Sequence, residues 1–233
     1  MSKEPESSNI WLSTKETIER LKELNIEYNW RIPSEVFDIK IPNVELGKKE
    51  ILTPLLRMSS NKDTASPQNT IESLLFALKK ELAKIGCKIV FERGTFISDP
   101  QNMELTYPEH NYGIFGLMKF NYANNIANEE ILLSSLIKQE KIEPPVFHSA
   151  AETLLTMIIH INWIKKMGSK DFPSPIMAGY RFNNYGSWKN LSYACAYYCK
   201  LTNSLEFGEI WSNTKILGFA LNTYEQVGQG IKY

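Results

Sequence analysis

One segment, Ala150 to Ile164, constrains the fold more than the rest of the chain because it is apolar on almost every face of a helix. Its apolar side chains are Leu154, Leu155, Met157, Ile158, Ile159, Ile161, Trp163 and Ile164. A capping box formed by Ser149 and Glu152 starts the predicted helix, and Gly168 ends it after Met167. A helix without a polar face needs cover on all sides, so we predict that it lies at the centre of the core.

Other segments supply the elements that could cover this helix. A second capping box, Ser13 with Glu16, predicts a helix start near the N-terminus. Apolar residues at helical spacing between Ile71 and Ile85 predict an amphipathic helix that ends at Gly86. Alternating apolar residues predict strands at Glu35 to Ile41, Cys87 to Glu92 with Thr95 to Ser98 as a hairpin, and Tyr112 to Tyr122.

The pattern of these elements favours an α+β fold. We expect a small antiparallel β meander, formed by the strands between Cys87 and Tyr122, followed by a helix-dominated C-terminal half. The further helices predicted in that half are Glu129 to Gln139, Ser187 to Lys200, Leu205 to Trp211 and Thr214 to Val227.

Composition along the chain predicts four parts. Residues 1–9 are polar, which predicts a disordered tail. Residues 10–56 are predicted to form an N-terminal helix followed by an extended segment that prolines interrupt. Residues 57–69 are rich in Ser, Asn and Asp, which is typical of a loop or linker. Residues 70–233 then form the main α+β domain.

The charge balance and the cysteine content indicate which partners and which cellular compartment to expect for the protein. Lys and Arg together number 26 and so do Asp and Glu, which argues against general binding to nucleic acid or anionic membranes. No segment reaches the roughly 20 apolar residues of a transmembrane helix, and no secretory signal is visible. Three cysteines do not indicate a disulfide-stapled secreted domain, so we expect a cytoplasmic protein.

Catalytic chemistry has little support in the sequence. The chain holds three histidines and lacks the motifs of nucleotide-binding folds, serine hydrolases, kinases and zinc proteases, so we assign no catalytic residue, no metal and no cofactor. An enzyme of unfamiliar type remains an alternative, with a site assembled around His160, Cys195 and Arg181. Cys195 and Cys199 sit four residues apart on a predicted helix and with His160 could offer zinc ligands, although core thiols are the commoner outcome.

Two aromatic or apolar segments remain as candidate binding surfaces. The stretch 180–198 interleaves Tyr and Trp with Arg181, Lys189 and asparagines, which could stack on single-stranded nucleic acid or on a carbohydrate. The loop 170–179 holds apolar residues between prolines, and Trp11 follows the polar tail. The residues that we predict to bind a partner are Trp11, Phe172, Ile176, Met177, Tyr185 and Trp188.

These observations favour a non-enzymatic protein–protein interaction protein. Such a chain would serve as an adaptor or assembly subunit whose partners are other protein subunits. An accessory component of a bacterial secretion machine is one example, although no sequence motif indicates it. The amphipathic helices, the zero net charge and the apolar loop residues support this class. The nucleic-acid or carbohydrate binder and the unfamiliar enzyme are the alternatives.

Overall fold

The computed structural model describes residues 10–57, 67–92, 103–105, 114–122, 131–133, 135, 150–169, 171–183, 191–211 and 213–232. Its helices are α1 (Thr14–Tyr28), the 3-10 helix η1 (Ser34–Phe37), α3 (Pro67–Lys84), α5 (Ala150–Ile159) and α6 (Ile161–Ile164). Its strands are β1 (Glu50–Arg57), β2 (Lys88–Phe91), β3 (Met103–Leu105), β4 (Ile114–Asn121), β5 (Ile131–Leu132), β6 (Ser174–Asn183), β7 (Leu191–Cys199), β8 (Ser204–Trp211), β9 (Lys215–Ile216), β10 (Phe219–Leu221) and β11 (Thr223–Lys232).

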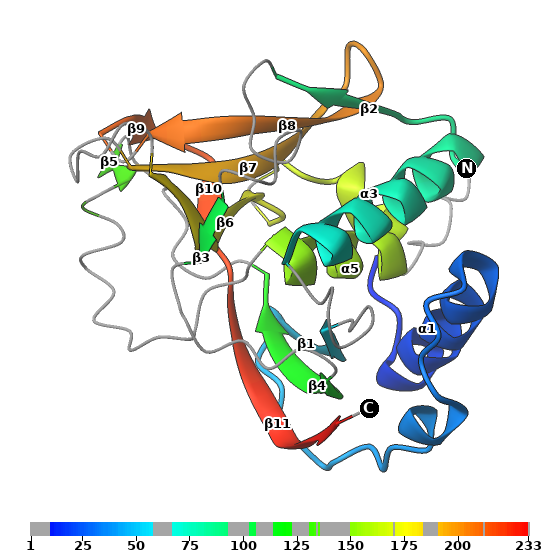
Figure 1. Ribbon diagram of the computed structural model, residues 1–233. Coiled ribbons are helices and arrows are strands. Elements are labelled where there is room, and N and C mark those ends of the chain that lie inside the picture. The colour runs from blue at the N-terminus through cyan, green and yellow to red at the C-terminus, as the bar shows by residue number, and fades with distance from the viewer. Residues whose placement is uncertain are drawn as a thin grey trace, which may run out of the picture.

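Two main sheets flank the central helix. A mixed sheet has the strand order β10-β6-β7-β8-β2, with β3 added against β6, and its pairs β10·β6 and β2·β8 are parallel. A three-stranded antiparallel sheet has the order β1-β4-β11, and β5 pairs with β9. In Figure 1, α5 lies between the sheet of β7 and β8 and the sheet of β1 and β4. No described helix is both long and apolar enough to cross a membrane.

The predicted position of the central helix in the core is confirmed, but α5 ends at Ile159 and not at Met167, and Ser149 of the predicted capping box lies outside the described residues. Residues 152–159 are buried without interruption, and α5 contacts α1, α3, β1 and β6. The helix breaks at His160, whose φ of −103° and ψ of 57° leave the helical region, and α6 continues after it. The predicted start of α1 is also confirmed, because Ser13 and Glu16 form both hydrogen bonds of the capping box.

The predicted helix-dominated C-terminal half is wrong. Of the segments expected to be helices, Ser187 to Lys200 contains β7, Leu205 to Trp211 lies in β8, and Thr214 to Val227 contains β9, β10 and the start of β11. The helix expected at Glu129 to Gln139 contains the strand β5, and most of its other residues lie outside the described part of the chain. Both faces of the mixed sheet are covered: Ala194 and Ala196 of β7 face the helices, while Tyr193 and Cys195 face a second core cluster. Apolar residues therefore occur at consecutive positions, which hides the two-residue period of a strand.

The predicted antiparallel meander is also wrong. Strand β2 pairs in parallel with β8, β3 pairs with β6, and β4 pairs with β1 and β11, so the three strands have distant partners in two sheets. The segment expected to be a strand at Glu35 to Ile41 begins instead with η1, which buries the adjacent side chains Val36 and Phe37. The predicted strand Thr95 to Ser98 lies outside the described residues.

The core has two parts separated by the mixed sheet. The larger cluster fills the space among α1, α3, α5 and the sheets, and its largest fully buried side chains include Trp163, Phe120 and Phe207. The smaller cluster packs on the other face of β7, around Tyr193, Cys195 and Ile210. The boundaries predicted at residues 9, 57 and 69 stay predictions, because residues 1–9 and 58–66 lie outside the described part of the chain.

Candidate functional site

The six predicted partner-binding residues have different positions. Ile176 and Met177 on β6 are fully buried in the two core clusters and offer no surface. Phe172 and Trp11 are half-buried, and their ring centroids lie 6.2 Å apart although the residues are distant in sequence. Tyr185 and Trp188 lie outside the described residues. Among the described residues of this set, Phe172 and Trp11 are therefore the ones with exposed surface that a partner could contact.

The residues of the alternative enzyme site do not form one site. His160 contacts the Trp11 ring on the helix side of the mixed sheet, whereas Cys195 belongs to the cluster on the opposite face. The side chain of Arg181, on β6, lies outside the described side chains. Of the aromatic stretch 180–198, Tyr193 is buried, and Tyr197 donates a hydrogen bond to Glu92.

Cys195 and Cys199 do not share a metal site either. Both lie on β7 rather than on a helix, and a four-residue separation on a strand spans about 13 Å. Burial, with the nearby Glu92 and Glu209, raises the pKa of the Cys195 thiol to about 12, which makes it a poor ligand or nucleophile. Among the described residues no three His, Cys, Asp or Glu side chains gather closely enough to hold a metal ion.

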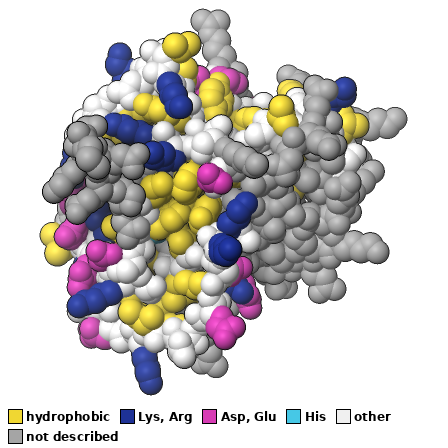
Figure 2. Space-filling view, turned by 180° about the vertical axis from the view of Figure 1, so that it is seen from behind, with side chains coloured by type: hydrophobic (Ala, Val, Ile, Leu, Met, Phe, Trp, Pro, Cys, Tyr) yellow, Lys and Arg dark blue, Asp and Glu magenta, His cyan; other side chains and the backbone are white. Residues whose placement is uncertain are grey.

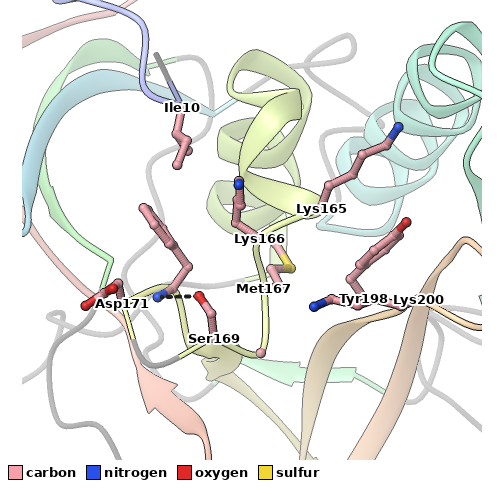
Figure 3. A pocket seen from close by; sticks show the side chains of 10 residues that line it. Ile10, Lys165, Lys166, Met167, Ser169, Asp171, Tyr198 and Lys200 are labelled. Atoms are coloured by element: carbon pink, nitrogen blue, oxygen red, sulfur yellow. Dashed lines mark hydrogen bonds between the residues drawn. The ribbon is translucent and has the colours of Figure 1, made fainter. Parts of the chain in front are cut away.

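A pocket of about 540 Å³ lies where the end of α6 meets the end of β7 and the N-terminal segment. Its lining residues are Ile10, Lys165, Lys166, Met167, Gly168, Ser169, Asp171, Phe172, Tyr198 and Lys200. In Figure 3, Ile10 and Asp171 lie on one side of the turn that follows α6, and Tyr198 and Lys200 lie on the other. We take this lysine-lined pocket as the candidate functional site.

The turn after α6 builds the floor of the lysine-lined pocket. The Met167 amide donates to the Ile164 carbonyl at 3.1 Å, and the Ser169 amide donates to the Lys166 carbonyl at 3.3 Å. Gly168 between them has a φ of +82°, a conformation that side chains disfavour. The Phe172 amide closes the loop by donating to the Ser169 hydroxyl at 3.2 Å. This bonding holds the lining residues 165–169, 171 and 172 in place without regular structure.

The polar groups of the pocket are mostly positive. Three lysines face one acid, Asp171, in a chain with no net charge. The Lys165 ammonium donates to the Ile85 carbonyl at the end of α3, at 3.2 Å. Lys166 and Lys200 are exposed and have no ion-pair partner among the residues that the structure describes. Two cations are therefore available to an anionic ligand.

The remaining pocket residues supply apolar surface and structural bonds. Met167 is buried, and Ile10, Phe172 and Tyr198 are half-buried. The Tyr198 hydroxyl donates to Asn203 Oδ1 at 2.6 Å, and Asn203 Nδ2 donates to the Gly86 carbonyl at 2.7 Å. The tyrosine thus contributes its ring to the pocket while its hydroxyl ties the turn after β7 to the end of α3.

His160 holds the N-terminal segment, whose Ile10 lines the pocket. Its Nδ1 accepts a hydrogen bond from the Leu12 amide at 3.2 Å, and burial lowers its pKa to about 3. An accepting Nδ1 carries no proton, so the ring is neutral with its proton on Nε2. The side chain is 1% exposed, which makes His160 a structural histidine rather than a general base.

Lowering the pH from about 6.5 to about 5 should destabilise the protein through His160. Its pKa of about 3 in the folded state lies below the usual value of 6.5, so in this window the unfolded chain binds a proton that the folded chain excludes. The contribution is complete above the unfolded pKa and is lost at up to about 1.4 kcal/mol per pH unit as the pH falls. Urea denaturation across this range measures it.

The matched variant for this prediction is His160→Gln, whose side-chain oxygen can still accept the Leu12 amide. The wild type should lose more free energy of unfolding than the variant as the pH falls, because only the wild type carries the titrating ring. Equal pH slopes in both proteins would contradict the assignment of a buried neutral imidazole.

Sequence reasoning missed the site because its parts come from distant segments. The run Lys165-Lys166 followed by Gly168 and Asp171 was a visible signal, since cations around a turn glycine are typical of an exposed loop. The contributions of Ile10, Tyr198 and Lys200 depend on the fold, and the predicted helix at Ser187 to Lys200 would have placed the last two differently.

Comparison of the chain with protein-family models, curated proteins and solved structures finds no match.

Proposed function

We propose that the chain is a non-enzymatic protein-interaction protein, an adaptor or assembly subunit, which binds an acidic segment of a partner protein in the lysine-lined pocket. The observation that carries this proposal is the pair Lys166 and Lys200, exposed and without an ion-pair partner in the described residues, beside the apolar Met167 and Phe172. Cations next to apolar surface fit a peptide that combines carboxylates with an apolar side chain.

The form of the pocket favours a peptide over a small molecule. Small-molecule sites usually bury most of the ligand and place a few polar groups deep inside. Here the polar groups stand at the surface: Lys165, Lys166, Ser169, Asp171 and Lys200 are all exposed. Leu201, directly after Lys200, is 98% exposed. A partner that covers the rim would bury more of this surface than a small ligand.

Two further observations support binding rather than catalysis. Among the described residues, the pocket lining includes no histidine or cysteine, and the hydroxyl of its serine, Ser169, accepts the Phe172 amide with no imidazole in the lining to activate it. Figure 2 displays apolar side chains gathered near the middle of the face opposite to the view of Figure 1, with charged side chains of both signs around them. An apolar area rimmed by polar groups is typical of interaction surfaces.

Reversing two pocket charges should abolish most of the binding of an acidic peptide. The probe is a fluorescein-labelled peptide, Glu-Asp-Glu-Phe-Asp-Glu-Asp, measured by fluorescence anisotropy at low salt. The variant Lys166→Glu with Lys200→Glu should raise Kd at least about tenfold, because two attractive contacts become repulsive. Raising the ionic strength to about 0.3 M should weaken wild-type binding, since exposed charges are screened.

The control is Lys79→Glu, which reverses an exposed lysine on α3 outside the pocket. This variant reverses one charge outside the pocket and should bind within about twofold of the wild type, because an exposed charge that makes no contact with the ligand is screened by salt. A peptide with lysines in place of the acids tests the sign of the interaction. No binding of the acidic peptide to the wild type, or equal losses in the pocket and control variants, would overturn the proposal.

A further inference from the structure

The segment of residues 10–12, which we name the N-terminal strap, is anchored by one tryptophan. The Trp11 ring packs among five aromatic rings, with centroid distances of 4.6 Å to Tyr122, 5.1 Å to His160 and 5.3 Å to Trp163. The others are Phe120 at 6.4 Å and Phe172 at 6.2 Å. Next to it, the Leu12 amide donates to His160 Nδ1.

The strap also forms part of the pocket wall. Ile10 lines the pocket directly, and Trp11 contacts Phe172, which lines it as well. The Phe172 ring also stacks on the Tyr122 ring, with the ring centroids 5.6 Å apart and an angle of 11° between the ring planes. Undocking of the strap would remove Ile10 from the pocket and expose the Phe172 ring on the side where Trp11 now packs.

The docked strap has a poorly satisfied interface. Three buried N–H groups around it, Trp11 Nε1, Trp163 Nε1 and His160 Nε2, have no hydrogen-bond partner in the described residues. A buried donor without an acceptor opposes burial, because it loses its hydrogen bonds to water. The strap is also short and precedes the capped start of α1 at Ser13, so it can leave without unfolding that helix.

We propose that docking of the N-terminal strap and binding at the lysine-lined pocket are coupled, so that the pocket accepts its acidic ligand only when the strap is docked. This inference rests on the proposed function. The coupling is reciprocal: docking of the strap raises the affinity for a ligand that contacts Ile10 and Phe172, and the bound ligand raises the docking equilibrium of the strap by the same factor. The strap thereby acts as a regulatory element of the site.

The first test measures hydrogen exchange of the Leu12 amide in the wild-type protein with and without the peptide Glu-Asp-Glu-Phe-Asp-Glu-Asp at saturation. Exchange requires that the bond to His160 Nδ1 opens, so it reports strap undocking. We expect the peptide to slow this exchange at least fivefold, while the amides of buried α1 residues such as Leu24 change much less. Unchanged exchange at Leu12 with bound peptide would overturn the coupling.

The second test compares peptide affinity in Trp11→Ala and in Ile26→Ala. Trp11 lies at the edge of the core and contributes no charge to the pocket, so we expect Trp11→Ala to raise Kd at least tenfold. Ile26 on α1 is 81% exposed and lies outside this pocket, so Ile26→Ala should leave Kd unchanged.

The outcomes separate the two proposals. Peptide binding to the wild type with equal affinity in Trp11→Ala would overturn the coupling and leave the proposed function standing. Failure of the wild type to bind the peptide would overturn the proposed function and the coupling with it. The exchange measurement needs no substitution, so it decides the coupling even if Trp11→Ala does not fold.

Discussion

Replacing Trp163 by alanine should lower the free energy of unfolding by about 3–5 kcal/mol, the range for deleting a large aromatic side chain from a core. The Trp163 side chain is fully buried and packs edge-on against Phe120, with the ring centroids 5.9 Å apart. The Trp163 and Trp11 ring centroids are 5.3 Å apart, so the substitution also removes one of the ring contacts that hold the N-terminal strap. Urea denaturation at neutral pH measures the loss.

The matched control for Trp163→Ala is Trp211→Ala on β8. Trp211 is 39% exposed, so it has less apolar area to lose and leaves no closed cavity. We expect its truncation to cost less than about 1.5 kcal/mol. A loss for Trp163→Ala as small as that for Trp211→Ala would contradict the central place of α6 in the core.

Replacing Glu81 by alanine should lower the free energy of unfolding by about 3 kcal/mol, the lower end of the range for breaking a buried ion pair. The Glu81 side chain, on α3, is 4% exposed and accepts hydrogen bonds from Arg20 at 2.5 Å and from the Tyr28 hydroxyl at 2.6 Å, both on α1. Lys84 donates to it at 2.7 Å. The substitution leaves these donors without the acceptor that joins the two helices.

Two features place the expected loss for Glu81→Ala at the lower end of that range. Arg20 also pairs with Glu23 at 2.9 Å, and Lys84 also pairs with Glu27 at 2.7 Å, so each cation keeps one carboxylate partner after the substitution. The control is Glu27→Ala, whose side chain is 41% exposed and whose pair with Lys84 should contribute less than about 1 kcal/mol. Equal effects of Glu81→Ala and Glu27→Ala in urea denaturation would contradict a buried α1–α3 connection.

Burial and the Glu81 carboxylate together raise the pKa of the Tyr28 phenol, which therefore stays protonated and continues to donate. The connection between α1 and α3 thus depends on a polar group that the sequence pattern did not single out. Glu81 looks like any other charged residue on the predicted amphipathic helix from Ile71 to Ile85. Its burial follows from the position of α1, which local periodicity does not encode.

Local signals in the sequence identified the elements that depend on nearby residues. The capping box of Ser13 and Glu16 and the end of α3 before Gly86 each rest on contacts within a few residues. The φ of +68° at Gly86 has the same local origin. These features could be read correctly because the interaction and the sequence pattern share the same short range.

The strands of the C-terminal half could not be read in the same way. Residues of β7 such as Ala194 and Cys195 are buried on opposite faces of one sheet, and consecutive apolar positions suit a buried helix as well as a buried strand. The parallel pairing of β2 with β8 joins segments more than 100 residues apart. Only the partner strand decides between the two interpretations.

The candidate site divides along the same line. Lys165, Lys166 and the turn up to Asp171 were visible in the sequence as a charged segment around Gly168. The approach of Ile10, Tyr198 and Lys200 to that turn was decided by the tertiary structure, because Ile10 comes from the N-terminal segment and the other two come from the end of β7. Neither segment carries a local signal of its neighbours. Hydrogen bonds and caps act within a few residues, whereas a pocket forms between segments that meet only when the core has assembled.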